Sequence, residues 1–454
     1  MPQPAKPPGL QNIKKRILSG GIWVTGGFVI NAFAGLFIGI LLSRILPSND
    51  VGNYFLIFSI ATSAAVLGQL GMNRAIVRFT AGFIASGEPG RARATAVRCL
   101  VIIILVCIAY ILLMSFPASI QLFNSLFPDT GLGAHVFIVG IWAGANTLRR
   151  FLAELSRGAH NIKLAALTQR ILVNVFLLCG LLIAWLVHID ASLLQILIFA
   201  TASTLLVATI ALIKNITWIH NQPRGLPESY RTIYQASAPL FLSQGLQLLM
   251  TQFPIWILGA LHAGSNVAFF GVATRTTLFV SMPLLIANNV IMPLVAALYK
   301  SGHKEKLRTL LSVSVTVTSV ASTIMALVFF GFGEAILGIL YGDEYVQGYT
   351  PLVILTFGAV LNVYAGSATV LLAMSGNEQW VLKSVAISAF VSVATGFILV
   401  QSMDATGAAL ASSLGLILYN LLISLKARSI TGISSFISPA AVKMFTHQII
   451  KNRQ

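Results

Sequence analysis

Long apolar runs dominate the chain, and short polar segments separate them. About twelve of these runs have at least the roughly 20 residues that an apolar helix needs to cross about 30 Å of hydrocarbon. They cover approximately residues 20–42, 53–76, 96–116, 133–153, 166–187, 192–213, 236–258, 267–297, 309–331, 349–374, 381–401 and 407–426. The pattern predicts an all-α membrane protein with about 12 transmembrane helices.

The polar segments differ in charge. All but two of the 29 Lys and Arg residues precede the first run, lie at or beyond the end of the last run, or lie in or beside alternate gaps, and the exceptions are Arg44 and Arg275. Lys and Arg near the ends of a span resist translocation, so these gaps are expected to be cytoplasmic. The alternation predicts a multi-pass protein with cytoplasmic N- and C-termini.

The composition is typical of a membrane protein and not of a soluble domain. The chain is 57% hydrophobic and 9% charged, with a mean hydropathy of +0.87, whereas a soluble domain is roughly 25% charged. The net charge of +17 is explained by basic residues at span ends, which orient the protein and attract anionic lipid, so we expect no nucleic-acid partner. The three cysteines are too scattered within apolar runs for a metal site or a disulfide framework.

The polar gap at 214–235 contains Pro223, Gly225 and Pro227, and its composition is typical of a linker. An even number of spans on each side of it gives two halves with the same orientation, as in parallel-repeat transporters. In chain order, this division predicts a cytoplasmic segment 1–19, an N-lobe 20–213, a cytoplasmic linker 214–235, a C-lobe 236–426 and a cytoplasmic or interfacial segment 427–454.

The sequence contains none of the common catalytic or nucleotide-binding motifs. It contains no GxxxxGK[ST] loop, no GxGxxG after a strand and no HExxH, so we expect neither an enzyme, nor an ATP-driven pump, nor a cofactor. Carboxylates are nearly absent from the runs. Glu154 lies in a plausible helix continuation, and Arg150 is four residues away, positioned to pair with it. A neutral-to-basic interior favours an anionic cargo, because proton or cation exchange usually needs buried acids.

Polar residues inside the runs are the candidate binding groups. Ser59, Thr62, Gln69 and Asn73 are spaced along one face of a helix, and so are Gln244, Gln247 and Thr251. Helices with such faces could line a shared cavity. The alternative is hydrogen bonding between helices, worth about 0.6 kcal/mol per bond. The candidate substrate-binding residues are Asn31, Gln69, Arg74, Arg78, Arg149, Arg150, Gln244, Gln247, Arg275 and Asn289.

Arg275 is the most unusual of these candidates, because it lies well inside a run. An arginine at mid-membrane costs at least about 2.5–3.5 kcal/mol. Its side chain either extends to the outer headgroups or lines a wet cavity, where guanidinium can hold phosphate bidentately. Arg74 with Arg78, and Arg149 with Arg150, lie at the inner ends of two runs and are expected to form the cytoplasmic mouth of the same path.

Three segments of the chain resemble a known family: Leu42–Ile60, Gly71–Phe79, and Leu340–Tyr345 through Leu371–Asn377. They are similar to polysaccharide repeat-unit flippases of the O-antigen type, in the multidrug/oligosaccharidyl-lipid/polysaccharide (MOP) exporter superfamily. The resemblance implies two six-helix lobes in a V, a cavity with alternating access, and an undecaprenyl-pyrophosphate-linked oligosaccharide as cargo. No acidic cation site of the family can be matched.

The resulting expectation is a bacterial inner-membrane flippase for surface polysaccharides such as lipopolysaccharide O-antigen. Its partners would be the lipid-linked oligosaccharide and membrane lipids, with a polysaccharide polymerase and glycosyltransferases as candidates. The main alternative is a cation-coupled multidrug exporter of the same superfamily. A major-facilitator carrier is disfavoured because its Asp and Arg loop pattern is missing from 78–91. A membrane glycosyltransferase is disfavoured because the longest outer loop, 117–132, has only Asp129 as an acid.

Overall fold

The computed structural model describes residues 10–262, 264–433 and 435–436, and every regular element in this part of the chain is helical. The predicted all-α fold is confirmed. In chain order the elements are α1 (Leu10–Ile45), α2 (Ser48–Gly68), α3 (Met72–Ala85), α4 (Pro89–Ser115), α5 (Pro117–Leu126), η1 (Pro128–Thr130), η2 (Leu132–His135), α6 (Val136–Gly158), α7 (Ile162–Ala166), η3 (Leu167–Ile171), α8 (Leu172–Leu186), α9 (Leu193–His220), α10 (Tyr230–Leu261), α11 (Gly264–Lys300), α12 (Lys304–Tyr341), η4 (Asp343–Gly348), α13 (Tyr349–Ala365), α14 (Ala368–Met374) and α15 (Glu378–Thr431).

Each predicted apolar run falls on one or more of these helices. Nine candidate spans in the described residues are long and apolar enough to cross a membrane. One of them, α15, joins two helices that meet at Asp404, where φ is 46° and ψ is −129°. The number of twelve spans stays a prediction. The N-terminal residues 1–9 and most of the predicted interfacial segment, 437–454, lie outside the described residues.

The second predicted run is not one continuous helix. Helix α2 ends at Gly68, and Leu70 and Gly71 adopt φ values of 50° and 73° before α3 begins. Glycine suits this left-handed turn, and a Cβ on Gly71 would lie only 2.2 Å from the carbonyl oxygen of Ser237. The prediction that Asn73 continues the helical face of Ser59 was therefore wrong, because the turn reorients the chain.

The fifth predicted run also departs from regular α-helix. Residues Leu167–Ile171 form a π-helical turn between α7 and α8. Such turns widen the backbone and are frequent at functional sites. Here the turn holds Thr168 and Gln169 opposite α6, where their carbonyl groups accept hydrogen bonds from Arg149.

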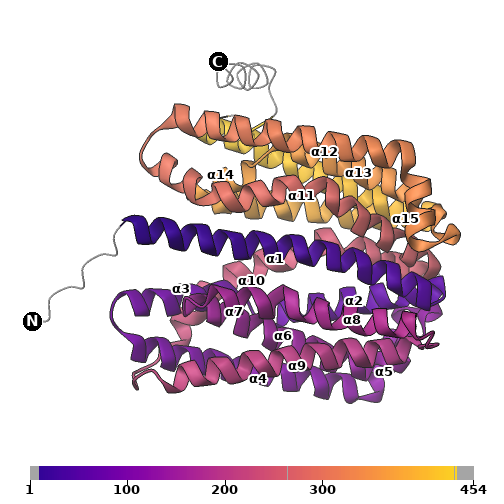
Figure 1. Cartoon of the computed structure of the whole chain (residues 1–454), viewed down its shortest axis with the longest axis horizontal. Coiled ribbons are helices and arrows are strands. Elements are labelled where there is room, and N and C mark those ends of the chain that lie inside the picture. Colours follow the sequence, from indigo (N-terminus) through magenta and orange to yellow (C-terminus); the bar gives the residue numbers. More distant parts are fainter. Residues whose placement is uncertain (1–9, 263, 434, 437–454) are drawn as a thin grey trace, which may run out of the picture.

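The helices are arranged in two bundles. Figure 1 shows α1 running between a group that contains α2–α9 and a group that contains α11–α15. Helix α10 contacts α2 and α3 as well as α15. We call α1–α9 the N-lobe and α10–α15 the C-lobe; the residue limits assigned to the lobes from the sequence stay predictions.

The two ends of the bundle differ in charge. We define the basic end by Arg91, Arg157, Lys300, Lys383 and Lys426, and the acidic end by Asp50, Asp343, Glu344 and Asp404. This matches the charge alternation in the sequence, because the helices run between the two ends in turn. The assignment of the basic end to the cytoplasm stays a prediction.

The hydrophobic core shows how the lobes meet. In the half near the acidic end, one buried cluster joins both lobes and includes Leu42, Leu56, Phe269 and Leu352. In the half near the basic end, the core divides into one cluster around Ile76 and Phe151 and another around Leu311 and Leu371. The lobes therefore share a core at the acidic end and have separate cores at the basic end.

Close contacts seal the acidic end. A Cβ on Gly52 of α2 would lie 1.7 Å from the carbonyl oxygen of Gly264 at the start of α11, so the two backbones touch. The Arg44 guanidinium donates to the Ile339 carbonyl at 2.7 Å. The Ser48 hydroxyl donates to the carboxylate of Glu344. These contacts close the space between the lobes on this side.

Candidate functional site

A cavity of about 490 Å³ lies between the lobes and is lined by α1, α2, α6, η3, α8, α10 and α11. Its size is within the range of about 300–1,000 Å³ common for ligand pockets. No Asp or Glu belongs to its lining among the described residues. The polar lining residues are Asn31, Tyr54, Ser59, Thr62, Asn146, Arg149, Arg150, Gln169, Asn174, Thr251, Gln252, Thr274 and Arg275.

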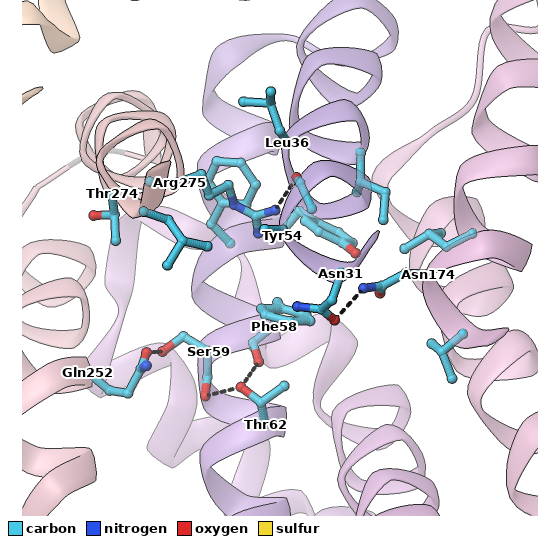
Figure 2. A pocket seen from close by; sticks show the side chains of 18 of the residues that line it. Asn31, Leu36, Tyr54, Phe58, Ser59, Thr62, Asn174, Gln252, Thr274 and Arg275 are labelled. Atoms are coloured by element: carbon cyan, nitrogen blue, oxygen red, sulfur yellow. Dashed lines mark hydrogen bonds between the residues drawn. The ribbon is translucent and has the colours of Figure 1, made fainter. Parts of the chain in front are cut away.

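Arg275 lies in the acidic half of this cavity. It comes from α11 of the C-lobe, and its guanidinium carbon lies 4.1 Å from the ring centroid of Phe55 on α2. Its Nη1 donates to the carbonyl of Gly35 on α1 at 3.1 Å (Figure 2). Both contacts cross from one lobe to the other. The side chain lines the cavity instead of extending to the headgroups, and most of its five N–H donors have no protein acceptor among the described residues.

Aromatic rings form the wall beneath Arg275. Phe58 lies one helical turn from Phe55, and its ring centroid is 5.7 Å from the Arg275 guanidinium carbon. Tyr54 stacks on Phe58 with ring centroids 6.3 Å apart, and Trp142 supports both rings from α6. A cation over such faces is held by the ring quadrupole and keeps its N–H edge available. The wall orients Arg275 toward the cavity without neutralising its charge.

Amides and hydroxyls occupy the middle of the cavity. The Asn174 side chain donates to Asn31 at 2.9 Å, and Ser59 donates to Gln252 at 2.7 Å (Figure 2). Each amide has two donors and an acceptor with two lone pairs. One hydrogen bond therefore leaves capacity on each amide for a polar ligand.

Arg149 lies in the basic half and is held by its own lobe. Its guanidinium donates to the carbonyls of Thr168 and Gln169 in the π-helical turn and to Asn146 at 2.8 Å. The side chain is 5% exposed. These bonds use several of its donors, so Arg149 mainly ties α6 to η3.

Glu154 belongs to the same network but does not line the cavity. Arg157 forms an ion pair with it at 3.1 Å, and Gln169 donates to it at 2.8 Å. Arg157 also donates to the Gln169 side chain at 2.7 Å. Arg157, three residues along α6, supplies this ion pair. The expected pairing of Arg150 with Glu154 stays a prediction. The structure places Arg150 in the cavity lining.

Of the ten candidate residues, the cavity brings together four: Asn31, Arg149, Arg150 and Arg275. The other six, which do not line it, are Gln69, Arg74, Arg78, Gln244, Gln247 and Asn289. The four arginines expected at the cytoplasmic mouth therefore do not all line the cavity: Arg149 and Arg150 line it, and Arg74 and Arg78 do not. The Gln69 amide donates to the carbonyl of Ala65. The Gln244 amide exchanges hydrogen bonds with Asn73 at 3.0 and 3.2 Å, which is the interhelical alternative.

Sequence reasoning missed several lining residues. Asn174 and Gln169 lie in the fifth apolar run, and Asn146 lies in the fourth. The criterion that found Asn31, an amide inside an apolar run, would also have found these. Phe55 and Phe58 gave no signal, because aromatic residues are expected throughout spans.

The fold is shared with solved transporters. A multidrug resistance MATE family transporter of the MOP superfamily, in an inward-facing conformation, is 17% identical, with 88% of this chain and 94% of that chain covered and a TM-score of 0.70. The lipid II flippase MurJ, in an inward closed conformation, is 14% identical, with 90% and 87% covered and a TM-score of 0.69. A MOP superfamily transporter from Pyrococcus furiosus is 16% identical, with 92% and 96% covered and a TM-score of 0.65. No individual curated protein matches the chain.

Two helical lobes around a polar cavity, with these structural neighbours, define a multi-pass helical membrane protein with a MATE-like fold. The family model described as "Polysaccharide biosynthesis protein" matches residues 17–299, which is more than half of the chain. The chain therefore belongs to the polysaccharide biosynthesis protein family. This confirms the family resemblance found in the sequence.

Proposed function

We propose that the protein is a flippase that moves a polyprenyl-pyrophosphate-linked oligosaccharide across the bacterial inner membrane for assembly of surface polysaccharide such as O-antigen. The observation that carries this proposal is a cavity lined by arginines without a carboxylate in the described residues. A pyrophosphate headgroup is anionic, and arginine binds phosphate oxygens through its planar fork. Arg275 is the residue best placed to do so.

The middle of the cavity suits the sugar. A charged or hydroxylated headgroup loses its water when it enters hydrocarbon, which costs several kcal/mol per unpaired polar group and far more per charge. Asn31, Asn174 and Gln252 offer amide groups in place of that water. The polyprenyl tail stays in the lipid, so the protein needs to enclose the headgroup alone.

The direction of transport follows from charge and packing. The basic end is expected to face the cytoplasm, and both termini with it. Since the lobes share a core near the acidic end and have separate cores near the basic end, this state accepts cargo from the cytoplasmic side. Glycosyltransferases would supply that cargo, and a polymerase would consume it on the other side.

A cation-coupled multidrug exporter is the second candidate, because transporters of that kind share the fold. Cationic drugs and coupling ions need acidic partners in the cavity. The cavity has none among the described residues, and Glu154 outside it is paired with Arg157. The charge of the cavity therefore favours the anionic cargo.

A binding experiment with the purified full-length protein in detergent distinguishes the two candidate functions. Undecaprenyl pyrophosphate and the cationic dye rhodamine 6G are titrated in parallel, with undecaprenol as a control that has the tail but no phosphate. We expect undecaprenyl pyrophosphate to bind saturably and undecaprenol to bind at least tenfold more weakly. Saturable dye binding without pyrophosphate binding would overturn the flippase proposal.

A further inference from the structure

A second group of cationic side chains lies at the basic end of the C-lobe, away from the cavity. Trp380 is in the first turn of α15, Lys383 follows three residues later, and Lys426 comes from the last turns of the same element after the chain has reversed at Asp404. The Lys426 ammonium lies 3.8 Å from the Trp380 ring centroid, and the Lys383 ammonium lies 4.6 Å from it. We call Trp380, Lys383 and Lys426 the tryptophan site.

Two like charges converge on one indole in this site. Because both ammonium nitrogens lie close to the same ring, their separation cannot exceed the sum of the two distances. No carboxylate of the described residues lies within 4 Å of either lysine. The indole N–H also has no protein acceptor in the described chain. Among the described residues, the site thus holds two positive charges and a donor without an acceptor, and it has no anionic partner.

The position of the site identifies the kind of anion. Trp380 directly precedes the apolar run 381–401, and Lys426 ends the run 407–426. Tryptophan is enriched where a span meets the headgroups, and lysines at this depth attract anionic lipid. The anions concentrated at this level of a membrane are lipid headgroups.

We propose that the tryptophan site binds the phosphate group of an anionic lipid headgroup, with Lys383 and Lys426 supplying charge and the indole N–H donating a hydrogen bond. The phosphate comes either from a bulk anionic phospholipid or from a polyprenyl pyrophosphate. None of the three residues lines the cavity, so this site operates independently of the proposed function.

The test measures lipid binding to the full-length protein by native mass spectrometry, with phosphatidylglycerol, undecaprenyl pyrophosphate and zwitterionic phosphatidylcholine as probes. The double variant Lys383→Gln/Lys426→Gln is expected to bind an anionic probe at least about tenfold more weakly, because both charge-assisted contacts to the phosphate are lost. Trp380→Phe keeps the ring and loses the N–H, so its binding should be intermediate. Phosphatidylcholine binding should not change.

The matched control is Lys300→Gln/Lys306→Gln, which removes two exposed lysines from the same end of the same lobe without touching an aromatic ring. It should bind both anionic probes like the unmodified protein. A loss confined to phosphatidylglycerol identifies a structural phospholipid, and a loss confined to undecaprenyl pyrophosphate identifies a cargo-type headgroup. Unchanged binding in the Lys383/Lys426 variant, or an equal loss in the control, would overturn the proposal.

Discussion

The two halves of the cavity each contain an arginine, but the contacts of these arginines differ. Arg275 in the acidic half reaches from the C-lobe to Gly35 and Phe55 of the N-lobe. Arg149 in the basic half bonds to Asn146, Thr168 and Gln169 within its own lobe. Contacts between lobes must change when the lobes move, whereas contacts within a lobe persist.

A residue that lines the cavity is not always available to bind a ligand. Arg149 supports the shape of the N-lobe by satisfying carbonyls that the π-helical turn exposes. Among the described residues, Arg275 makes one hydrogen bond and rests on an aromatic ring, so a ligand anion can replace its protein partner at little cost. We therefore propose that Arg275 binds cargo and that Arg149 has a structural role.

The largest expected effect is on transport when Arg275 is removed. Loss of a hydrogen bond to a charged group costs about 1.5–3 kcal/mol, so Arg275→Ala should reduce translocation of a lipid-linked sugar by roughly 10–150-fold. Arg275→Lys should be intermediate, because ammonium lacks the planar fork. The assay is translocation in proteoliposomes at equal protein content. Arg78→Ala, which removes an arginine that does not line the cavity, is the control and should transport normally.

Removal of Arg149 should instead lower stability. Arg149→Ala leaves the carbonyls of Thr168 and Gln169 without this donor, and each unsatisfied buried group costs about 1–3 kcal/mol. The thermal unfolding midpoint in detergent should fall by several degrees, while Arg275→Ala should leave it nearly unchanged. If Arg275→Ala lowered the midpoint more than Arg149→Ala did, the structural role would belong to Arg275 and not to Arg149.

The seal at the acidic end offers a smaller perturbation. Gly52→Ala places a methyl group against the Gly264 backbone, and overpacking of this kind costs about 1–3 kcal/mol. We expect the closed state to be disfavoured, so that a cysteine replacing Thr274, which lines the cavity, reacts severalfold faster with an impermeant thiol reagent added at the acidic side. Gly331→Ala has no atom within 4 Å of the added carbon and should not change the rate.

The smallest effect is expected at Gln244. Its side chain pairs with Asn73 between α10 and α3 and does not line the cavity. Gln244→Ala should cost about 0.6 kcal/mol of stability and reduce transport by less than threefold. A loss of transport as large as that of Arg275→Ala would show that Gln244 contacts cargo during the cycle.

The fold was predictable because run length and charge alternation are properties of the sequence itself. The break at Leu70 was not predictable, since leucine seldom adopts a positive φ and the neighbouring Gly71 alone does not indicate a turn. The partner of Glu154 was ambiguous, because Arg150 and Arg157 are both spaced to reach it along a helix. Packing between helices, which the sequence does not specify, determines that Gln244 pairs with Asn73. It also determines that Asn31 lines the cavity.

We propose that the cavity carries an anion and that no acidic residue of the described chain couples the movement of this anion to a cation. Outward movement of one negative charge gains about 2.3 kcal/mol for each 100 mV when the cytoplasmic side is negative. Arginines that move with the cargo would cancel part of this gain. The potential should therefore drive transport without a pH or sodium gradient.

The most direct measurement follows translocation of a polyprenyl-pyrophosphate-linked oligosaccharide in proteoliposomes under a potassium-diffusion potential, with equal pH and sodium on both sides. Transport should accelerate when the side facing the basic end is negative and slow when the potential is reversed. Transport that ignores the potential and follows an imposed pH or sodium gradient would contradict the mechanism.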